Sequence, residues 1–209
     1  MRQLAKKCLP IVPSQAPRLV PHLARGFTLL EIMIVVVIMS VLLATGTPAL
    51  RAYMMNNKIL ANAESFLSGL QQARTEAVRS NTTVSFVMTS ATDLSATAAT
   101  PDVAGRSWIV SAPDPDNPAQ RIVISSKLAT EGGGNTVAVA GTAATVVFNS
   151  LGATNLGAIA IYAFSPVGGS CGGDIRCINV VVTPGGRTQI CDPAIASTAL
   201  ADSRRCITT

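Results

Sequence analysis

A continuous apolar segment near the N-terminus is the strongest pattern of hydrophobic positions in the chain. Residues 27–47 contain twelve Phe, Leu, Ile and Val side chains, and Glu31 is the only charged residue among them. As a helix the segment would be about 30 Å long, which matches the hydrocarbon core of a bilayer. Its large side chains contribute about −4 to −7 kcal/mol to insertion, whereas a carboxylate costs about +3 kcal/mol at mid-membrane. We therefore expect a transmembrane helix and assembly segment over residues 27–48.

A second pattern, with helical spacing, follows Pro48. Apolar residues recur every three or four positions, as on one face of a helix, at Ile59, Ala63, Phe66, Leu70, Ala73 and Ala77. Polar residues occupy positions between them, namely Lys58, Asn62, Glu64, Arg74 and Glu76. The pattern predicts one helix from about residue 28 to residue 80, bent or loosened near Pro48, which lacks a backbone donor. Residues 49–80 would be amphipathic and pack on a sheet, and Asn81 would cap the helix.

After Asn81 the pattern changes to short β-rich runs separated by turn-forming residues. The predicted strands are 83–88, 106–111, 121–126, 136–139, 145–148, 158–164, 177–183 and 187–191. The predicted connections are a loop at 90–101 and turns at 113–118, 132–135 and 183–186. Short strands with short connections imply an antiparallel meander or two small sheets. The expected fold class is α+β: a long N-terminal helix, transmembrane in its first half and amphipathic in its second, packed on an antiparallel β domain over residues 81–209.

Charge is distributed unevenly between the N-terminal tail and the rest of the chain. The formal net charge is +5, from 16 Lys and Arg against 11 Asp and Glu. Five basic residues and no acid precede Phe27, at Arg2, Lys6, Lys7, Arg18 and Arg25. The remainder is formally neutral, so the basic balance is not a sign of a nucleic-acid-binding domain. A basic flank stays on the cytoplasmic side of an apolar helix, which predicts a single-pass inner-membrane protein with its C-terminal domain in the periplasm.

The first 26 residues are expected to be a leader peptide rather than part of the fold. Prolines exclude a regular helix there, at Pro10, Pro13, Pro17 and Pro21. The alternative is a secretory signal peptide cleaved after the apolar segment. Such a peptide has an apolar core of about 7–15 residues, and the longer segment here favours an anchor.

Four of the five cysteines fall in the expected exported domain. Cys8 lies in the leader, and the others are Cys171, Cys177, Cys191 and Cys206. An even number of cysteines in an exported domain predicts disulfides, for which three pairings are possible. Closeness in sequence favours Cys171 with Cys177 and Cys191 with Cys206. A zinc site is disfavoured, because the spacings are not those of a zinc motif and no His follows the leader.

Residues that would support catalysis are missing from the expected mature chain. The only His, His22, lies in the leader, which leaves no His-dependent triad and no His general base. The Gly-rich runs lack the Lys-Ser or Lys-Thr ending of a phosphate-binding loop. Asp114 and Asp116 fit solvated turn residues better than a calcium loop, which would need a distal Glu. We expect no enzymatic activity, no cofactor and no bound metal.

The junction Gly26-Phe27-Thr28-Leu29-Leu30-Glu31, followed by a Val- and Ile-rich run that breaks at Pro48, resembles the class III signal of type IV pilins and type II secretion pseudopilins. The resemblance implies that a prepilin peptidase cuts after Gly26 and that Phe27 becomes an N-methylated N-terminus. It also implies that Glu31 engages the N-terminal amine of a neighbouring subunit during assembly. Such a pairing offsets the desolvation of both charges. An ordinary membrane anchor with Glu31 at the interface is the alternative, and a leader of 26 residues is long for this family.

Four later blocks resemble the GspH/FimT group of minor pilins and pseudopilins, at residues 71–79, 108–110, 147–152 and 186–191. With the junction, the resemblance covers nearly everything after residue 25 and implies a pilin-like fold. The implied function is that of a type IV pilus minor pilin, near the filament tip, or of the matching H-type pseudopilin of a type II secretion system. The implied partners are other pilin or pseudopilin subunits, the prepilin peptidase and inner-membrane lipid.

A contact with DNA is a further hypothesis. Some minor pilins of this group bind DNA during natural transformation through a Gly-Arg-any-Arg loop, and residues 186–189, Gly-Arg-Thr-Gln, keep its first Arg. A disulfide to Cys206 would place Arg204 and Arg205 beside Arg187, and the few phosphate contacts would give weak, salt-sensitive binding. The competing interpretation of these arginines is a solvated surface of mixed charge. For the whole protein, the competing interpretation is a monomeric membrane-anchored binding protein.

Overall fold

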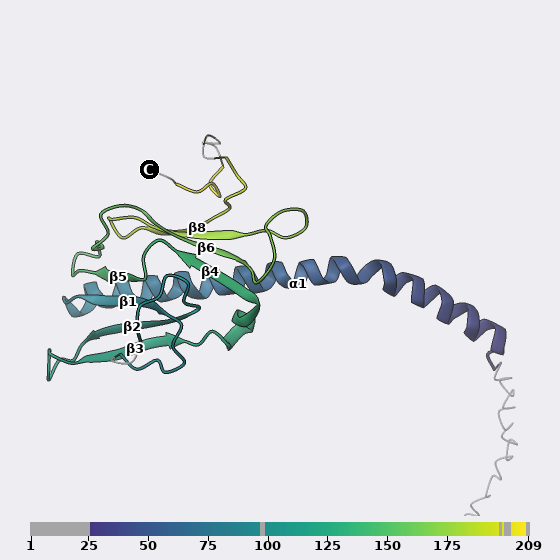
Figure 1. The fold of residues 1–209 in the computed structure, drawn as a ribbon, viewed down its shortest axis with the longest axis horizontal. Helices are drawn as coiled ribbons and strands as arrows, with labels where there is room; N and C mark the ends of the chain where they lie inside the picture. The colour runs from purple at the N-terminus through teal and green to yellow at the C-terminus, as the bar shows by residue number, and fades with distance from the viewer. Residues whose placement is uncertain (1–25, 97–98, 197, 199–201, 208–209) are drawn as a thin grey trace, which may run out of the picture. The chain divides into compact units, whose positions relative to one another are not determined.

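The structure is a computed structural model of the chain, which describes residues 26–96, 99–196, 198 and 202–207. The expected leader therefore lies outside the described residues, apart from Gly26. The chain divides into two compact units, Met1–Ala44 and Thr45–Thr209. Figure 1 shows the helix and the strands, and it labels α1 and all strands except β7 as they are named below.

The longest element is the helix α1, Leu29–Ser80, of 52 residues. Thr28 caps its start, because the backbone N–H of Glu31 donates to the Thr28 Oγ1 at 3.2 Å and a helix start leaves such amides without backbone partners. For a test of membrane spanning, α1 counts as two parts, Leu29–Ala44 and Ala49–Ser80. In the described chain no single helix is long and apolar enough to cross a membrane, but these two parts taken together meet the test by length and composition.

The second half of α1 buries the apolar stripe that the sequence predicted. Its members are at most 3% exposed, namely Ile59, Ala63, Phe66, Leu70, Ala73 and Ala77. The helix ends where expected, since Asn81 has a φ of 50° and the Thr82 N–H donates to the Ala77 carbonyl at 3.2 Å. This bond closes a Schellman motif, in which a left-handed residue terminates a helix.

Eight strands form two four-stranded antiparallel sheets in the unit Thr45–Thr209. The first sheet has the order β3-β2-β1-β5, with β1 Val84–Thr89, β2 Ser107–Pro113, β3 Arg121–Lys127 and β5 Thr145–Phe148. The second has the order β4-β6-β7-β8, with β4 Val137–Gly141, β6 Ala160–Pro166, β7 Ile178–Val182 and β8 Thr188–Cys191. The α+β class is confirmed, and of the two predicted arrangements the structure has two small sheets.

The core lies where α1 packs against both sheets (Figure 1). Phe66 of α1 stands at its centre, with its ring centroid 4.7 Å from that of Phe86 on β1. Its ring is also 4.8 Å from Tyr162 and 5.5 Å from Phe164, both on β6. Aromatic pairs at these distances contribute about 0.5–1.5 kcal/mol each beyond the area they bury. One helix residue thus joins the two sheets into a single core.

Two local features differ from the sequence-based expectation. Asn62, expected at a polar position, is only 9% exposed; its amide donates to the Lys58 carbonyl at 2.8 Å and its Oδ1 accepts from Lys127 Nζ at 3.0 Å. The glycine run expected as a turn lies inside the 3-10 segment η1, Glu131–Thr136, which is kinked and non-helical at Gly132 and Gly133. Gly132 and Gly133 take φ values of 63° and 75° there, which residues with a side chain rarely adopt.

Candidate functional site

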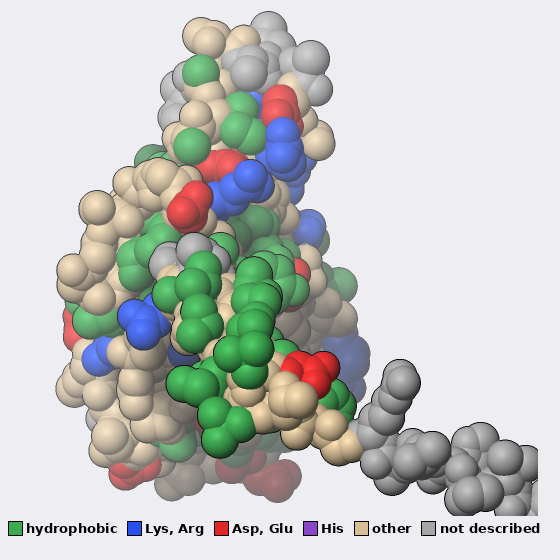
Figure 2. Space-filling view, turned by 90° about the vertical axis from the view of Figure 1, so that its right-hand side faces the viewer, with side chains coloured by type: hydrophobic (Ala, Val, Ile, Leu, Met, Phe, Trp, Pro, Cys, Tyr) green, Lys and Arg blue, Asp and Glu red, His purple; other side chains and the backbone are tan. Residues whose placement is uncertain are grey.

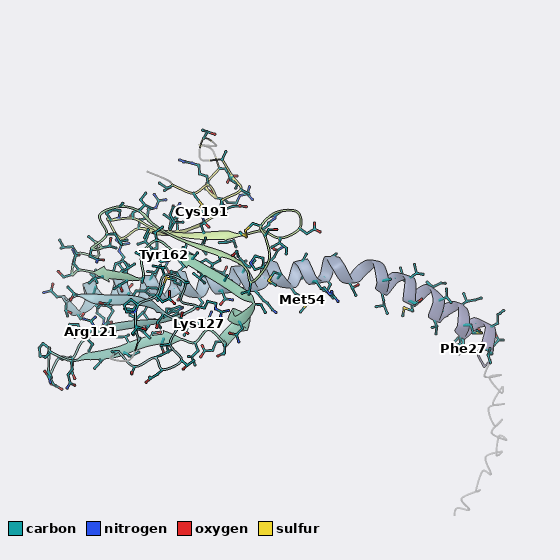
Figure 3. The ribbon with its side chains drawn as sticks, viewed as in Figure 1. Phe27, Met54, Arg121, Lys127, Tyr162 and Cys191 are labelled. Carbon is teal, nitrogen blue, oxygen red and sulfur yellow. A yellow bond between two sulfur atoms is a disulfide. The ribbon has the colours of Figure 1, made fainter. Side chains whose placement is uncertain are left out.

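The predicted processing and assembly residues lie together at the start of α1. Gly26 and Phe27 precede the helix, and Figure 3 labels Phe27 at this end, where its side chain is 77% exposed. Glu31 lies in the first turn and is exposed, and its carboxylate makes no hydrogen bond or ion pair with any residue that the structure describes. A negative charge is favoured at a helix N-terminus. The carboxylate therefore lies exposed in a position that favours negative charge.

The three arginines of the predicted basic patch do not come together. Arg187 stands directly before β8, whereas the disulfide joins Cys206 to Cys191 at the other end of that strand. The four residues of β8 cover about 13 Å. The expectation that this disulfide would place Arg204 and Arg205 beside Arg187 is therefore wrong, because the bridge ties the C-terminal segment to the far end of β8.

Arg204 and Arg205 lie instead in a setting of mixed charge. Arg204 pairs with Asp202 at 2.9 Å, and the hydrogen bond between them raises the pKa of Arg204 and lowers that of Asp202. Arg205 bridges through its backbone to Asp192. In the upper part of the face drawn in Figure 2, basic and acidic side chains lie next to one another. A phosphate would have to compete there with carboxylates of the same chain.

The turn that precedes Arg187 lies close to Arg74 of α1. A Cβ added at Gly186 would lie 3.3 Å from the Arg74 Nε, and one added at Gly152 would lie 2.9 Å from the same atom. The turn before β8 and the loop after β5 therefore both approach the Arg74 side chain. Sequence reasoning treated Arg74 only as a polar helix position, and no local signal links residues so far apart in the chain.

One disulfide closes the loop before β7, and the other ties the segment after β8 to the end of that strand. Cys171 pairs with Cys177 across six residues and Cys191 pairs with Cys206 across fifteen, which are the pairings that closeness in sequence favoured. The side-chain amide of Asn56 on α1 binds the smaller loop through both its nitrogen and its oxygen. Its Nδ2 donates to the carbonyl oxygen of residue 174 at 2.8 Å, and its Oδ1 accepts from the backbone N–H of residue 176 at 2.9 Å.

Two partly buried cations on the edge strand β3 were not anticipated. Arg121 donates to the Ser85 Oγ at 3.0 Å and to the Ser111 carbonyl at 2.5 Å, while Lys127 donates to Asn62 of α1. Figure 3 labels the two cations at opposite ends of β3, and burial lowers the pKa of both. Charged side chains that point inward discourage an edge strand from pairing with another chain. Both cations therefore disfavour the pairing of β3 with a further strand.

No group of three or more His, Cys, Asp or Glu side chains among the described residues is placed to hold a metal ion.

An apolar helix start that carries a methylation motif, continued into a two-sheet α+β unit, defines a pilin-like protein. Residues 22–47 match the prokaryotic N-terminal methylation motif, and residues 62–186 match the family of the type II transport protein GspH. The chain belongs to the GspH family, which confirms the predicted membership of the GspH/FimT group.

Two solved structures are similar to part of the chain. The type IV minor pilin FimU of Pseudomonas aeruginosa is 17% identical, with a TM-score of 0.46 over 66% of this chain and 95% of FimU. The minor pseudopilin EpsH from the type 2 secretion system of Vibrio cholerae is 14% identical, with a TM-score of 0.47 over 66% of this chain and 99% of EpsH. Among curated proteins, none matches the chain significantly.

Proposed function

We propose that the chain is a minor subunit of a type IV pilus, with a structural role in assembly and no catalytic one. In this proposal residues 1–26 are a leader, residues 27–48 hold the subunit in the inner membrane, and residues 49–209 face the periplasm until the subunit enters the filament. The observation that carries the proposal is the exposed Glu31 carboxylate in the first turn of an apolar helix, within the segment that matches the methylation motif.

In this proposal the free-energy cost of an unpaired charge in the hydrocarbon core favours assembly. A prepilin peptidase would cut after Gly26 and leave Phe27 as a methylated amine. The carboxylate of Glu31 and the ammonium group of a neighbouring subunit are each costly in the membrane. They offset that cost when they pair, and only helices from two different subunits, packed side by side, can bring them together.

The substitution Glu31→Ala tests this role. We expect the variant to accumulate in the membrane at the wild-type level and to enter filaments at least about tenfold less, the effect of roughly 1.4 kcal/mol. Immunoblots of sheared filaments and of membranes from the same cells measure both quantities. Glu64→Ala, which removes an exposed carboxylate further along α1, is the matched control. Wild-type incorporation of Glu31→Ala would contradict this role of Glu31, whereas absence of the wild-type protein itself from filaments would favour a monomeric membrane-anchored protein.

A second candidate is the minor H-type pseudopilin of a type II secretion system. The match of residues 62–186 to the family of type II transport protein GspH supports it. Both candidates require the same processing and the same Glu31 pairing. Deletion of the gene separates them: loss of surface pili with normal secretion supports the minor pilin, and loss of secretion with normal pili supports the pseudopilin.

A DNA receptor for natural transformation is not the function we favour. The hypothesis needed Arg204 and Arg205 beside Arg187, and β8 separates them. Neutralising only a few phosphates gives weak and strongly salt-dependent binding. Absence of a salt-sensitive mobility shift of DNA with the wild-type protein at low salt would exclude this function.

A further inference from the structure

The edge strand β8 has backbone groups that point away from its sheet. β8 is the last strand in the order β4-β6-β7-β8, so only one of its sides is paired within the sheet (Figure 1). The Thr183 N–H donates to the Arg187 carbonyl oxygen at 2.9 Å, which makes these two residues a hydrogen-bonded pair. Hydrogen-bonded and non-hydrogen-bonded pairs alternate along an antiparallel ladder. The backbone N–H and carbonyl groups of Thr188 and Ile190 therefore point away from β7.

Asp192, two positions after Ile190, agrees with this alternation. Its N–H donates to the Arg204 carbonyl oxygen at 2.7 Å, and Asp192 forms a parallel bridge with Arg205. The C-terminal segment thus pairs with the edge just beyond β8. Within the described chain, no hydrogen bond outside the β7 ladder reaches the backbone of Thr188 or Ile190. The edge is therefore open along β8 itself.

Two other sheet edges are protected. The cations Arg121 and Lys127 point inward on β3. On β5, the Asn155 N–H donates to the Val147 carbonyl oxygen at 2.9 Å, and the Asn155 side chain accepts from the Val147 N–H at 2.8 Å, so a loop occupies that edge. The sequence of β8, Thr-Gln-Ile-Cys, carries no charge. An open and uncharged edge is a template on which another chain can add a strand.

An apolar groove lies between α1 and β8, beside the open edge. Its volume is about 390 Å³, and its apolar lining includes Leu60 on α1, Ile178 on β7 and Ile190 on β8. Leu60 is 38% exposed, so its side chain is only partly covered. Residues directly opposite one another on neighbouring strands place their side chains on the same face of a sheet. On a strand added to β8, the side chain opposite Ile190 would therefore enter the groove beside Leu60.

We propose that β8 binds an extended segment of a neighbouring filament subunit as an additional strand, with an apolar side chain of that segment in the groove beside Leu60 and Ile190. Main-chain hydrogen bonds give such a contact its affinity, and the groove selects the side chain. The proposal rests on the proposed function, in which other subunits surround the chain. Two copies joined through both β8 edges would be related by a two-fold axis, whereas the subunits of a filament repeat along a screw. A second copy joined through its own β8 is therefore not the occupant.

The test places a photo-crosslinking benzoylphenylalanine at Asn57 of the full chain, in cells that assemble the filament. Asn57 is exposed and lines the groove. Mass spectrometry of the intermolecular product identifies the crosslinked peptide. We expect a segment of another subunit in which an apolar residue lies within a β-forming stretch.

The substitution Thr188→Pro tests the backbone pairing. It removes an N–H that points away from β7, and proline is tolerated at the first residue of a strand. Thr188→Val keeps the N–H and a branched side chain, so it is the matched control. We expect Thr188→Pro to lower the yield of the Asn57 product about tenfold and Thr188→Val to leave it unchanged. Equal yields in the two variants would overturn the proposal.

The substitution Leu60→Asp tests the groove without altering β8. A carboxylate there would meet the apolar side chain of the added segment, so we expect a similar loss of the Asn57 product. Ala61→Asp changes the adjacent exposed helix position, which does not line the groove, and should leave the yield unchanged. An unchanged yield in Leu60→Asp would contradict the proposal even if Thr188→Pro failed to fold.

A second crosslinker separates this proposal from the proposed function. Placed at Leu43, an exposed residue of the apolar segment, it reports incorporation by itself. Intermolecular products at Leu43 without any at Asn57 would overturn this proposal alone, whereas no product at either site would count against the proposed function. An Asn57 product with lipid, with nucleic acid or with β8 of a second copy would also overturn the proposal.

Discussion

At the scale of single residues, Tyr162 places a phenolic hydroxyl in the core. Among the described residues it is the one buried side-chain polar atom without a hydrogen-bond partner, although its ring packs on Phe66. Burial raises the pKa of Tyr162 well above its ordinary value of about 10. The ring therefore stabilises the core while the hydroxyl weakens it.

We predict that Tyr162→Phe leaves the free energy of unfolding unchanged or raises it by about 1 kcal/mol, because an unpaired buried hydroxyl costs about 1–3 kcal/mol. The advantage should grow as the pH rises above about 10. The unfolded wild type then loses its phenolic proton while the folded state retains it, which lowers wild-type stability. Urea denaturation at neutral and alkaline pH measures this. Tyr53→Phe, at an exposed position, is the control, and a loss above 1 kcal/mol in Tyr162→Phe would show that the hydroxyl has a partner.

Gly186 is a second residue with a strict requirement. We predict that Gly186→Ala lowers the free energy of unfolding by about 3 kcal/mol, from a left-handed backbone cost and from overlap with the Gly152 carbonyl. Gly185→Ala is the matched control, because nothing lies within 4 Å of its Cβ position; a change within about 0.5 kcal/mol is expected there. Equal denaturation midpoints for the two variants would contradict the close contact between Gly186 and the Gly152 carbonyl oxygen.

At the scale of elements, the contact between α1 and the small disulfide loop depends on Asn56. We predict that Asn56→Ala speeds tryptic cleavage after Arg176 about tenfold or more, because two hydrogen bonds of about 1 kcal/mol each are lost and cleavage follows the open population. The fragments are read by mass spectrometry after reduction, since the Cys171–Cys177 bridge spans the cut. Asn57→Ala serves as the control, and equal rates for the two variants would argue against Asn56 as the clamp.

The elements themselves were largely predictable because their signals are local. The buried stripe of α1 repeats at helical spacing, and the predicted strand at 145–148 coincides with β5. The approach of Gly152 and Gly186 to Arg74 was not predictable, because it depends on strand order and on how two glycine-containing loops meet. Asn62 was misjudged for a similar reason: its partner Lys127 comes from a strand distant in sequence.

At the scale of the whole molecule, the disulfides add stability by restricting the unfolded chain. In the loop-entropy treatment the Cys191–Cys206 bridge contributes about 3 kcal/mol and the shorter Cys171–Cys177 bridge about 2 kcal/mol. We therefore predict that replacing both Cys191 and Cys206 by Ser lowers the free energy of unfolding more than replacing both Cys171 and Cys177 by Ser. Chemical denaturation of both double variants checks the order, and the reverse order would show that local contacts outweigh loop entropy.

The whole account depends on a subunit whose processed amino terminus pairs with the Glu31 carboxylate of another subunit. Glu31 lies four positions after Phe27 and is exposed, so it is accessible to a second chain.

The most direct test is the mass of the N-terminal peptide of the protein isolated from its native membranes or filaments. The account predicts a peptide that begins at Phe27 and carries a methyl group on its amine. A mature chain that retains residues 1–26, or one that begins after the apolar segment, would contradict it.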